Sequence, residues 1–258
     1  DVYYRTADGA VPPEIASYCP KPEGALRATK QEVVGVPVPS GTDNLQLEWF
    51  QVKEERQPNE WLGAWCKPAI YLYPETKTDV NVQVSPKGPF TLTIPEYKPG
   101  GWDVTAYPDG KIINAREGYP YLYWEARMQD KLLTEPTEGY VVTRDELTGL
   151  FNDILPKLGL NDKESYAFTA YWRNALPASP YYFVGVVPQA QVDALAPLNI
   201  SPKPDSVGRV TLYFKTLDEK IAVEEPNLTS FVRRGFTVTE WGGLFKADKA
   251  HKDFTCLM

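Results

Sequence analysis

Short runs of alternating apolar and polar residues fill the chain between residues 66 and 126. Residues 80–84 and 90–94 alternate Val, Phe, Leu and Ile with polar residues, which predicts strands with one face exposed to water. Residues 69–73 and 119–126 are apolar or aromatic at nearly every position, a pattern typical of strands buried on both faces. Turn residues separate these runs. The first half of the chain is therefore predicted to form an antiparallel sandwich or a barrel-like half, and antiparallel β-sandwich-like sheets are expected throughout the fold.

The hydrophobic period lengthens to that of an α-helix after Val142. Thr143 and Glu146 are spaced as in a capping box, apolar residues follow at helical spacing, and Gly159 is typical of a helix end. Pro156 lies inside this pattern and is expected to kink or shorten the helix. A first helix is thus predicted over this stretch.

A second capping pattern, Asn161 with Glu164, precedes another apolar stripe, so the two helices are predicted to form a hairpin over about residues 143–176. Strand patterns return afterwards, with room for a short helix at 189–195. The order of strands, helical hairpin and strands defines an α+β fold rather than alternating βαβ units. The later strands are expected at 181–187, 209–215 and 236–241.

The distribution of proline and of periodic patterns divides the chain into three parts. Residues 1–65 are rich in proline and lack sustained periodicity, which predicts a partly extended N-terminal arm. Residues 66–245 hold the strand and helix patterns and are expected to form the α+β core domain, and residues 246–258 follow as a C-terminal tail. Such an arm could add a strand to the open sheet edge of a neighbouring molecule, so self-association is one expected behaviour.

Charge and composition narrow the classes of function. The 258 residues include 27 Lys and Arg against 34 Asp and Glu, a net charge of −7, whereas nucleic-acid-binding surfaces are basic. No apolar run reaches the roughly 18 residues that a membrane helix needs, so no membrane span is predicted. His251 is the only histidine, which excludes sites built on two imidazoles. No cofactor, metal or nucleic-acid partner is predicted.

Two features favour an exported protein. The chain begins at Asp1 rather than Met, as expected after removal of a signal peptide or of other N-terminal residues, and the signal peptide is the favoured explanation. Of the three cysteines, Cys66 precedes the strongest strand pattern and is expected to form a disulfide with either Cys19 or Cys256. The sequence leaves both partners open, because the distance between Cα atoms determines which pair can bond.

Two Asn-x-Ser/Thr tripeptides are candidates for N-glycosylation. They begin at Asn199 and Asn227. Glycans would be attached there only in a eukaryotic secretory route, and such tripeptides are also frequent by chance.

Four ordered motifs resemble those of an uncharacterised family of exported microbial proteins. They are K-P-x-I-Y-L-Y-P at residues 67–74, G-W-x-V-x-A-x-P-D-G at 101–110, Y-L-Y-W-E at 121–125 and G-F-x-V-x-E-W-G-G at 235–243. The resemblance covers about residues 66–243 and implies a secreted or surface-anchored protein behind a variable N-terminal region. It implies no particular activity and no catalytic residues.

Two carboxylates stand beside tryptophans in these motifs. Glu125 follows Trp124, and Glu240 precedes Trp241. A glycoside hydrolase needs two carboxyl groups about 5 to 9 Å apart, and aromatic rings stack on sugars, so convergence of the two glutamates would predict that activity. The alternative is that each glutamate is a structural residue at a strand end.

Aromatic residues make up 13% of the chain, including 16 Tyr and 7 Trp, which is suited to a surface that stacks on glycan rings. The candidate ligand-binding residues are Trp102, Trp124, Trp241 and Tyr123. The same composition also fits cross-strand packing, in which Tyr and Trp are favoured. Stacking of a glycan on the tryptophans requires that at least two of their rings are partly exposed.

The sequence therefore favours a secreted or cell-surface binding module without catalytic activity, which recognises a glycan or another cell-surface polymer through Tyr and Trp. A glycoside hydrolase that uses Glu125 and Glu240 is one alternative. A structural or filament subunit assembled through the N-terminal arm is the other.

Overall fold

The computed structural model divides the chain into two compact units, residues 1–56 and 57–258. In the first unit, β1 (Val2–Arg5) and β2 (Glu48–Gln51) pair as antiparallel strands. Most of the predicted arm and tail lies outside the described residues, so both remain predictions. The described residues are 2–5, 48–51, 63–128, 132–246 and 256.

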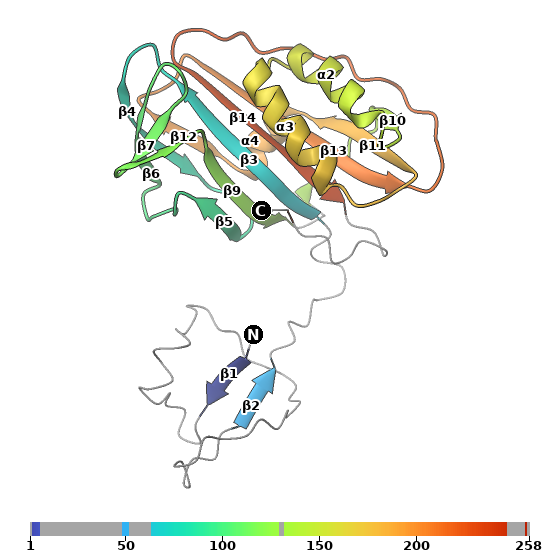
Figure 1. Cartoon of the computed structure of the whole chain (residues 1–258), viewed down its shortest axis with the longest axis horizontal. Helices are drawn as coiled ribbons and strands as arrows, with labels where there is room; N and C mark the ends of the chain where they lie inside the picture. Colours follow the sequence, from blue (N-terminus) through green and yellow to red (C-terminus); the bar gives the residue numbers. More distant parts are fainter. Residues whose placement is uncertain (1, 6–47, 52–62, 129–131, 247–255, 257–258) are drawn as a thin grey trace. The chain divides into compact units, whose positions relative to one another are not determined.

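The second unit contains two β-sheets (Figure 1). The larger has seven strands, in the order β10 (Tyr140–Val142), β11 (Tyr181–Val187), β13 (Ser206–Leu217), β14 (Thr237–Lys246), β3 (Gly63–Tyr73), β9 (Leu122–Met128) and β5 (Phe90–Ile94). The smaller has five strands, in the order β12 (Leu198–Ser201), β4 (Thr78–Val84), β6 (Trp102–Ala106), β7 (Ile112–Asn114) and β8 (Glu117–Tyr119). Together with the helices, these mostly antiparallel sheets confirm the predicted α+β class.

One pair of strands departs from the predicted antiparallel arrangement. β13 and β14 are parallel neighbours, and β14 lies between β13 and β3 in the middle of the larger sheet. The reason is the connection between them: residues 218–236 lead from the end of β13 around the helices, so that β14 enters the sheet in the same direction (Figure 1). The prediction of antiparallel pairing throughout is wrong for this pair.

Three helices accompany the sheets in the described part of the chain: α2 (Leu147–Lys157), α3 (Asp162–Ala175) and α4 (Gln189–Leu195). α2 and α3 form the predicted hairpin, and α4 has the predicted bounds of the short helix. None of these described helices is long and apolar enough to cross a membrane.

The two predicted capping boxes have different outcomes. The Asn161 side chain accepts a hydrogen bond from the Glu164 backbone, and the Glu164 carboxylate accepts one from the Asn161 backbone, both at 2.9 Å. At the first helix, the Glu146 carboxylate accepts hydrogen bonds from the backbone and hydroxyl of Thr143. These bonds close a turn, and α2 begins only at Leu147. The predicted helix start at residue 143 is therefore too early.

Apolar side chains cover both faces of the larger sheet. On one face, α2 and α3 contribute Phe151 and Trp172, both fully buried, to a cluster with side chains of β3, β13 and β14 (Figure 1). On the other face, Val82 and Trp102 of the smaller sheet belong to a second cluster with side chains of β3, β9 and β14. The central strands thus supply one row of side chains to each cluster, as their continuous apolar runs predict.

Candidate functional site

An irregularity in the central strand β3 positions a lysine near α3. Between the pairs Trp65–Ala126 and Ala69–Tyr123, β3 has an extra residue relative to β9, and its register against β14 shifts at the same place. Lys67 lies at this bulge with a φ of 51°, in the left-handed region that residues other than glycine seldom adopt. Bulges and such backbone angles are frequent at functional sites, where they redirect a side chain.

Tyrosine rings surround the Lys67 side chain. Its Nζ atom lies 4.7 Å from the ring centre of Tyr171 on α3, and 5.7 and 5.9 Å from those of Tyr121 and Tyr123. At such distances an ammonium group is attracted to aromatic rings. Lys67 and Tyr121 are partly exposed, whereas Tyr123 and Tyr171 are 6% and 9% exposed. We call Lys67, these three tyrosines and Glu125 the Lys67 cluster.

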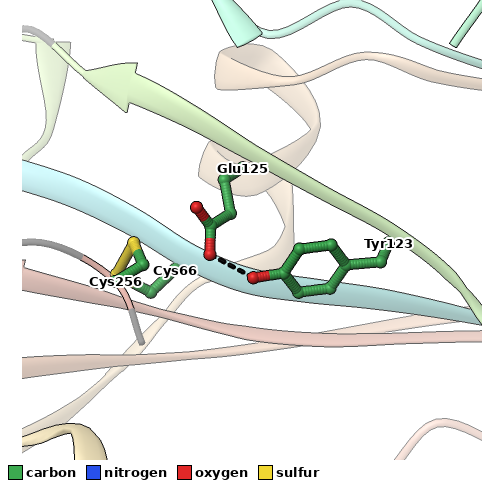
Figure 2. Close-up of a disulfide and its surroundings, with 4 residues drawn as sticks. All are labelled: Cys66, Tyr123, Glu125 and Cys256. Atoms are coloured by element: carbon green, nitrogen blue, oxygen red, sulfur yellow. Dashed lines mark hydrogen bonds between the residues drawn. A yellow bond between two sulfur atoms is a disulfide. The ribbon is translucent and has the colours of Figure 1, made fainter. Parts of the chain in front are cut away.

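Glu125 supplies the carboxylate of the cluster. It lies two residues after Tyr123 on the same face of β9, accepts a hydrogen bond from the Tyr123 hydroxyl and is 6% exposed (Figure 2). Burial raises the pKa of Glu125 above its ordinary value of 4.5, and the Tyr123 hydrogen bond and the Lys67 charge offset this effect only in part. Burial also raises the pKa of Tyr123, so its hydroxyl keeps the proton that it donates.

Glu125→Gln is expected to raise the midpoint of urea unfolding at pH 7. Because the pKa of Glu125 is higher in the folded than in the unfolded chain, the free energy of unfolding falls as pH rises from 4.5 through the raised pKa. The neutral amide removes this loss and can still accept the Tyr123 hydrogen bond. Below about pH 4, where Glu125 is protonated in both states, the variant and the wild type should have similar midpoints.

Glu117→Gln is the matched control for this experiment. Exposed Glu117 also accepts a hydrogen bond from a tyrosine two residues away, Tyr119. Its replacement is expected to leave the midpoint close to that of the wild type at both pH values. Equal losses of stability in Glu125→Gln at pH 7 and pH 4 would contradict this description of Glu125.

A disulfide adjoins the cluster. The Sγ atoms of Cys66 and Cys256 are bonded, and the Cα atoms are 5.3 Å apart. Cys66 is fully buried, immediately precedes Lys67, and its bond lies in the surroundings of Glu125 in Figure 2. Of the two partners that the sequence leaves open, the structure therefore has Cys256, and Cys19 lies outside the described residues.

Glu240 lies on the opposite face of the larger sheet. Its carboxylate is 2% exposed and accepts hydrogen bonds from Trp124 Nε1 at 2.9 Å and from Arg209 Nε at 2.6 Å. Since Trp124 and Glu125 are successive residues of β9, their side chains point to opposite faces. Glu125 and Glu240 therefore face away from each other, so these two residues do not form the carboxylate pair that a glycoside hydrolase would need.

Arg209 gives Glu240 a structural role instead. Besides Glu240, its guanidinium contacts the Asp193 carboxylate at 2.9 Å and the Ala196 carbonyl oxygen at 2.7 Å through Nη1. Burial alone would lower the pKa of Arg209, but the carboxylates of Glu240 and Asp193 outweigh that effect and raise it above the ordinary value. The charge of Glu240 is thus balanced by a permanently charged arginine.

The three tryptophans expected to bind a ligand are core residues. Trp102 is 1% exposed, and Trp124 and Trp241 are fully buried. Rings without exposed surface cannot stack on a sugar, so the prediction for these three residues is wrong. They fill the apolar clusters on the two faces of the larger sheet, because its central strands are buried on both sides. Of the four candidates, only Tyr123 belongs to the Lys67 cluster.

The two candidate glycosylation sites are accessible. Asn199 lies on the edge strand β12 and Asn227 between β13 and β14, and both side chains are exposed. Exposure is compatible with glycosylation, which stays a prediction.

The chemical groups of the cluster suit binding. Among the residues that the structure describes, no three His, Cys, Asp or Glu side chains are grouped to hold a metal ion. The Lys67 cluster instead combines an ammonium group, one carboxylate and three phenol rings. The partly exposed Lys67 and Tyr121 can contact a ligand, and the cluster holds one carboxylate rather than the pair that a glycoside hydrolase uses.

The sequence does not single out three members of the cluster, Lys67, Tyr121 and Tyr171, as site residues. One signal was available for Lys67: Pro68 interrupts an apolar strand pattern, and proline occurs in a central strand mainly at a bulge. Tyr171 lies on α3, far from Lys67 along the chain. Only the packing of α3 on the larger sheet brings the two residues together.

The fold and the cluster define an α+β protein with a polar, tyrosine-lined site. No protein-family profile and no solved structure matches the chain. A stretch of 65 residues, 24% of this chain, is 44% identical to the "Uncharacterized protein in bglA 3'region" of Butyrivibrio fibrisolvens and covers 68% of that protein. The chain therefore belongs to the same family as this uncharacterised protein.

Proposed function

We propose that this chain is a secreted or cell-surface binding module without catalytic activity, and that it holds a glycan at the Lys67 cluster. The observation that carries the proposal is the meeting of three tyrosine rings, an ammonium group and a buried carboxylate at one bulge of β3. A strained backbone angle and a carboxylate with a raised pKa at the same place are features of functional sites.

Each part of the cluster has a counterpart in a sugar. A pyranose ring carries C–H groups on its faces, which pack on aromatic rings, and hydroxyls at its edge, which hydrogen-bond to charged groups. Lys67 and Tyr121 are the more exposed members, so a ligand meets them first. The Glu125 carboxylate and the Tyr123 hydroxyl are already bonded to each other, so a sugar hydroxyl would extend an existing network.

The absence of catalysis and the export are supported by separate observations. Glu125 and Glu240 lie on opposite faces of the larger sheet, which argues against acid and base catalysis by this pair. The bond between Cys66 and Cys256 supports export, because disulfides persist in oxidising compartments.

A sandwich-like arrangement of the two sheets is part of the same proposal. It is supported by one apolar cluster that contains Val82 and Val104 of the smaller sheet together with Leu72 and Leu122 of the larger. Two sheets that pack in this way would form a rigid support for the cluster.

A structural subunit that assembles by strand addition has weaker support. Pro89 and Pro95 flank the edge strand β5, and Pro197 and Pro202 flank the edge strand β12. Proline lacks a backbone N–H and opposes the pairing of a sheet edge with another chain. These edges are therefore poor acceptors for an arm.

A glycan array combined with a pull-down on insoluble polysaccharides tests the proposed function. The wild type is expected to bind one class of glycan. Lys67→Met should bind it at least about tenfold more weakly, because methionine keeps much of the apolar stem but removes the charge. The unfolding midpoint of each variant is measured alongside, so that a loss of binding is separated from a loss of fold.

Lys77→Met is the matched control. Lys77 Nζ lies 5.9 Å from the ring centre of Tyr107, so it makes the same kind of contact next to the smaller sheet. This variant should bind as the wild type does. Binding of no glycan or polysaccharide by the wild type, or equal binding by Lys67→Met, would contradict the proposed function.

A further inference from the structure

The connection between β13 and β14 leaves a cavity beside the larger sheet. Parallel neighbours need a long connection, and this is usually a helix packed on the sheet. Residues 218–236 contain no helix or strand and pass around the outside of α2 (Figure 1). Between this connection, the end of α2 and strands β11 and β13 lies a cavity of about 460 Å³, a volume typical of small-molecule sites.

The wall that the connection provides is held in place. The Phe231 ring occupies the space beside Gly159 and Gly208, where a Cβ atom on either glycine would collide with it. Arg233 donates hydrogen bonds to the Gly159 carbonyl oxygen at 3.2 and 3.1 Å and forms an ion pair with Glu164. The connection is thereby fixed to the end of the helical hairpin, so the cavity is a built feature of the fold.

Apolar side chains form about half of the cavity wall. Val186 of β11, Val210 of β13 and Leu158 at the end of α2 line it from the body of the protein. Leu228 and Phe231 line it from the connection. Such walls suit the C–H faces of a ligand rather than a fully hydrated ion.

Three polar side chains of the lining are available to a ligand. Glu138, Asn227 and Thr229 have no side-chain hydrogen bond within the part of the chain that the structure describes. Arg209 also contributes to the lining, but its guanidinium is bonded to Glu240 and other acceptors. The described lining thus offers a carboxylate, an amide and a hydroxyl, and it lacks a free cation that would attract an anion.

We infer that this cavity is a second ligand site, independent of the Lys67 cluster, for a neutral sugar ring or a similar small polyol. The apolar walls match the faces of such a ring. The side chains of Glu138, Asn227 and Thr229 match its hydroxyls, which both donate and accept hydrogen bonds.

A titration followed by ¹⁵N-HSQC spectra tests this site with glucose, N-acetylglucosamine and cellobiose as probes. At least one sugar is expected to shift the amide signals of Val186, Leu228 and Thr229, with a dissociation constant of about 1 mM or higher, as expected for a few uncharged hydrogen bonds. Val186→Phe should fill the cavity and weaken this binding at least about tenfold. Asn227→Ala, at an exposed position, should weaken it without affecting the fold.

Two further variants serve as controls. Val232→Phe places the same ring at an exposed position of the same connection, outside the cavity, and should bind as the wild type does. Lys67→Met should also leave these shifts unchanged, so the outcome is separate from that of the proposed function. Absence of shifts at these three amides with all three sugars, or shifts that persist unchanged in both Val186→Phe and Asn227→Ala, would overturn the inference.

Discussion

Replacing Arg209 with Met is expected to lower the free energy of unfolding by about 3 to 5 kcal/mol, the usual cost of leaving a buried charge without its partner. Arg209 is 3% exposed and Glu240 is 2% exposed. Without the guanidinium, the Glu240 carboxylate stays in the core with one described hydrogen bond, from Trp124 Nε1. Urea unfolding at pH 7 measures the change.

A second substitution separates the lost charge balance from lost packing. Arg209→Met combined with Glu240→Gln should recover much of the stability, because both charges are gone and the amide oxygen can still accept the hydrogen bond from Trp124. Lys157→Met is the matched control: its ion pair with Asp153, at 2.7 Å, is nearly as short as that of Arg209 with Glu240, at 2.6 Å, but it is exposed to solvent. Losses of similar size in Arg209→Met and Lys157→Met would show that burial does not determine the effect.

Replacing Cys66 and Cys256 together with Ala is expected to lower the free energy of unfolding by about 2 to 5 kcal/mol. The bond joins residues separated by 190 positions, so it restricts the unfolded chain strongly. The wild type under reducing conditions should unfold at nearly the same urea concentration as the variant. Cys19→Ala is the control and should keep the midpoint of the oxidised wild type.

A thiol-labelling experiment checks the same bond directly. Native, unreduced protein should take up no label at Cys66, because this residue is fully buried and bonded. Rapid labelling of Cys66, together with an unchanged unfolding midpoint in the double variant, would contradict the assigned disulfide.

The local elements of the fold could be predicted because each depends on neighbouring residues. Phe151, Ile154 and Phe168 stand at helical spacing within the apolar stripes of the predicted hairpin, and all three are fully buried. The box formed by Asn161 and Glu164 is also a local signal, and it is present in the structure. Leu150 shows the limit, since it has the same spacing but lies at the margin of the contact and is only partly buried.

The direction and position of strands could not be predicted. The apolar pattern of β14 is the same whether the strand runs parallel or antiparallel to its neighbour, and the pairing with β13 is decided by a connection without regular structure. When a strand is apolar on both faces, its sequence also does not reveal on which face of the sheet each side chain is buried. Successive residues of β9 point to opposite faces of the larger sheet. Trp124 therefore meets Glu240 on one face, and Glu125 lies on the opposite face.

The Lys67 cluster depends on three elements at once. β3 supplies Lys67 at a bulge, β9 supplies Tyr123 and Glu125, and α3 supplies Tyr171. Of its members, the sequence singled out Tyr123 and Glu125, both within one motif. Tyr171 joins Lys67 only when the hairpin is packed on the larger sheet.

Titration calorimetry with the oligosaccharide that binds best on the array tests the central claim most directly. Tyr121 is partly exposed, so Tyr121→Ala removes a ring from the proposed site at a position outside the fully buried core. It should weaken binding by about 1 to 3 kcal/mol, or roughly 5- to 150-fold, whereas Tyr107→Ala, at the ring beneath Lys77, should bind as the wild type does. Equal affinities of Tyr121→Ala and the wild type would contradict the assignment of the glycan to the Lys67 cluster.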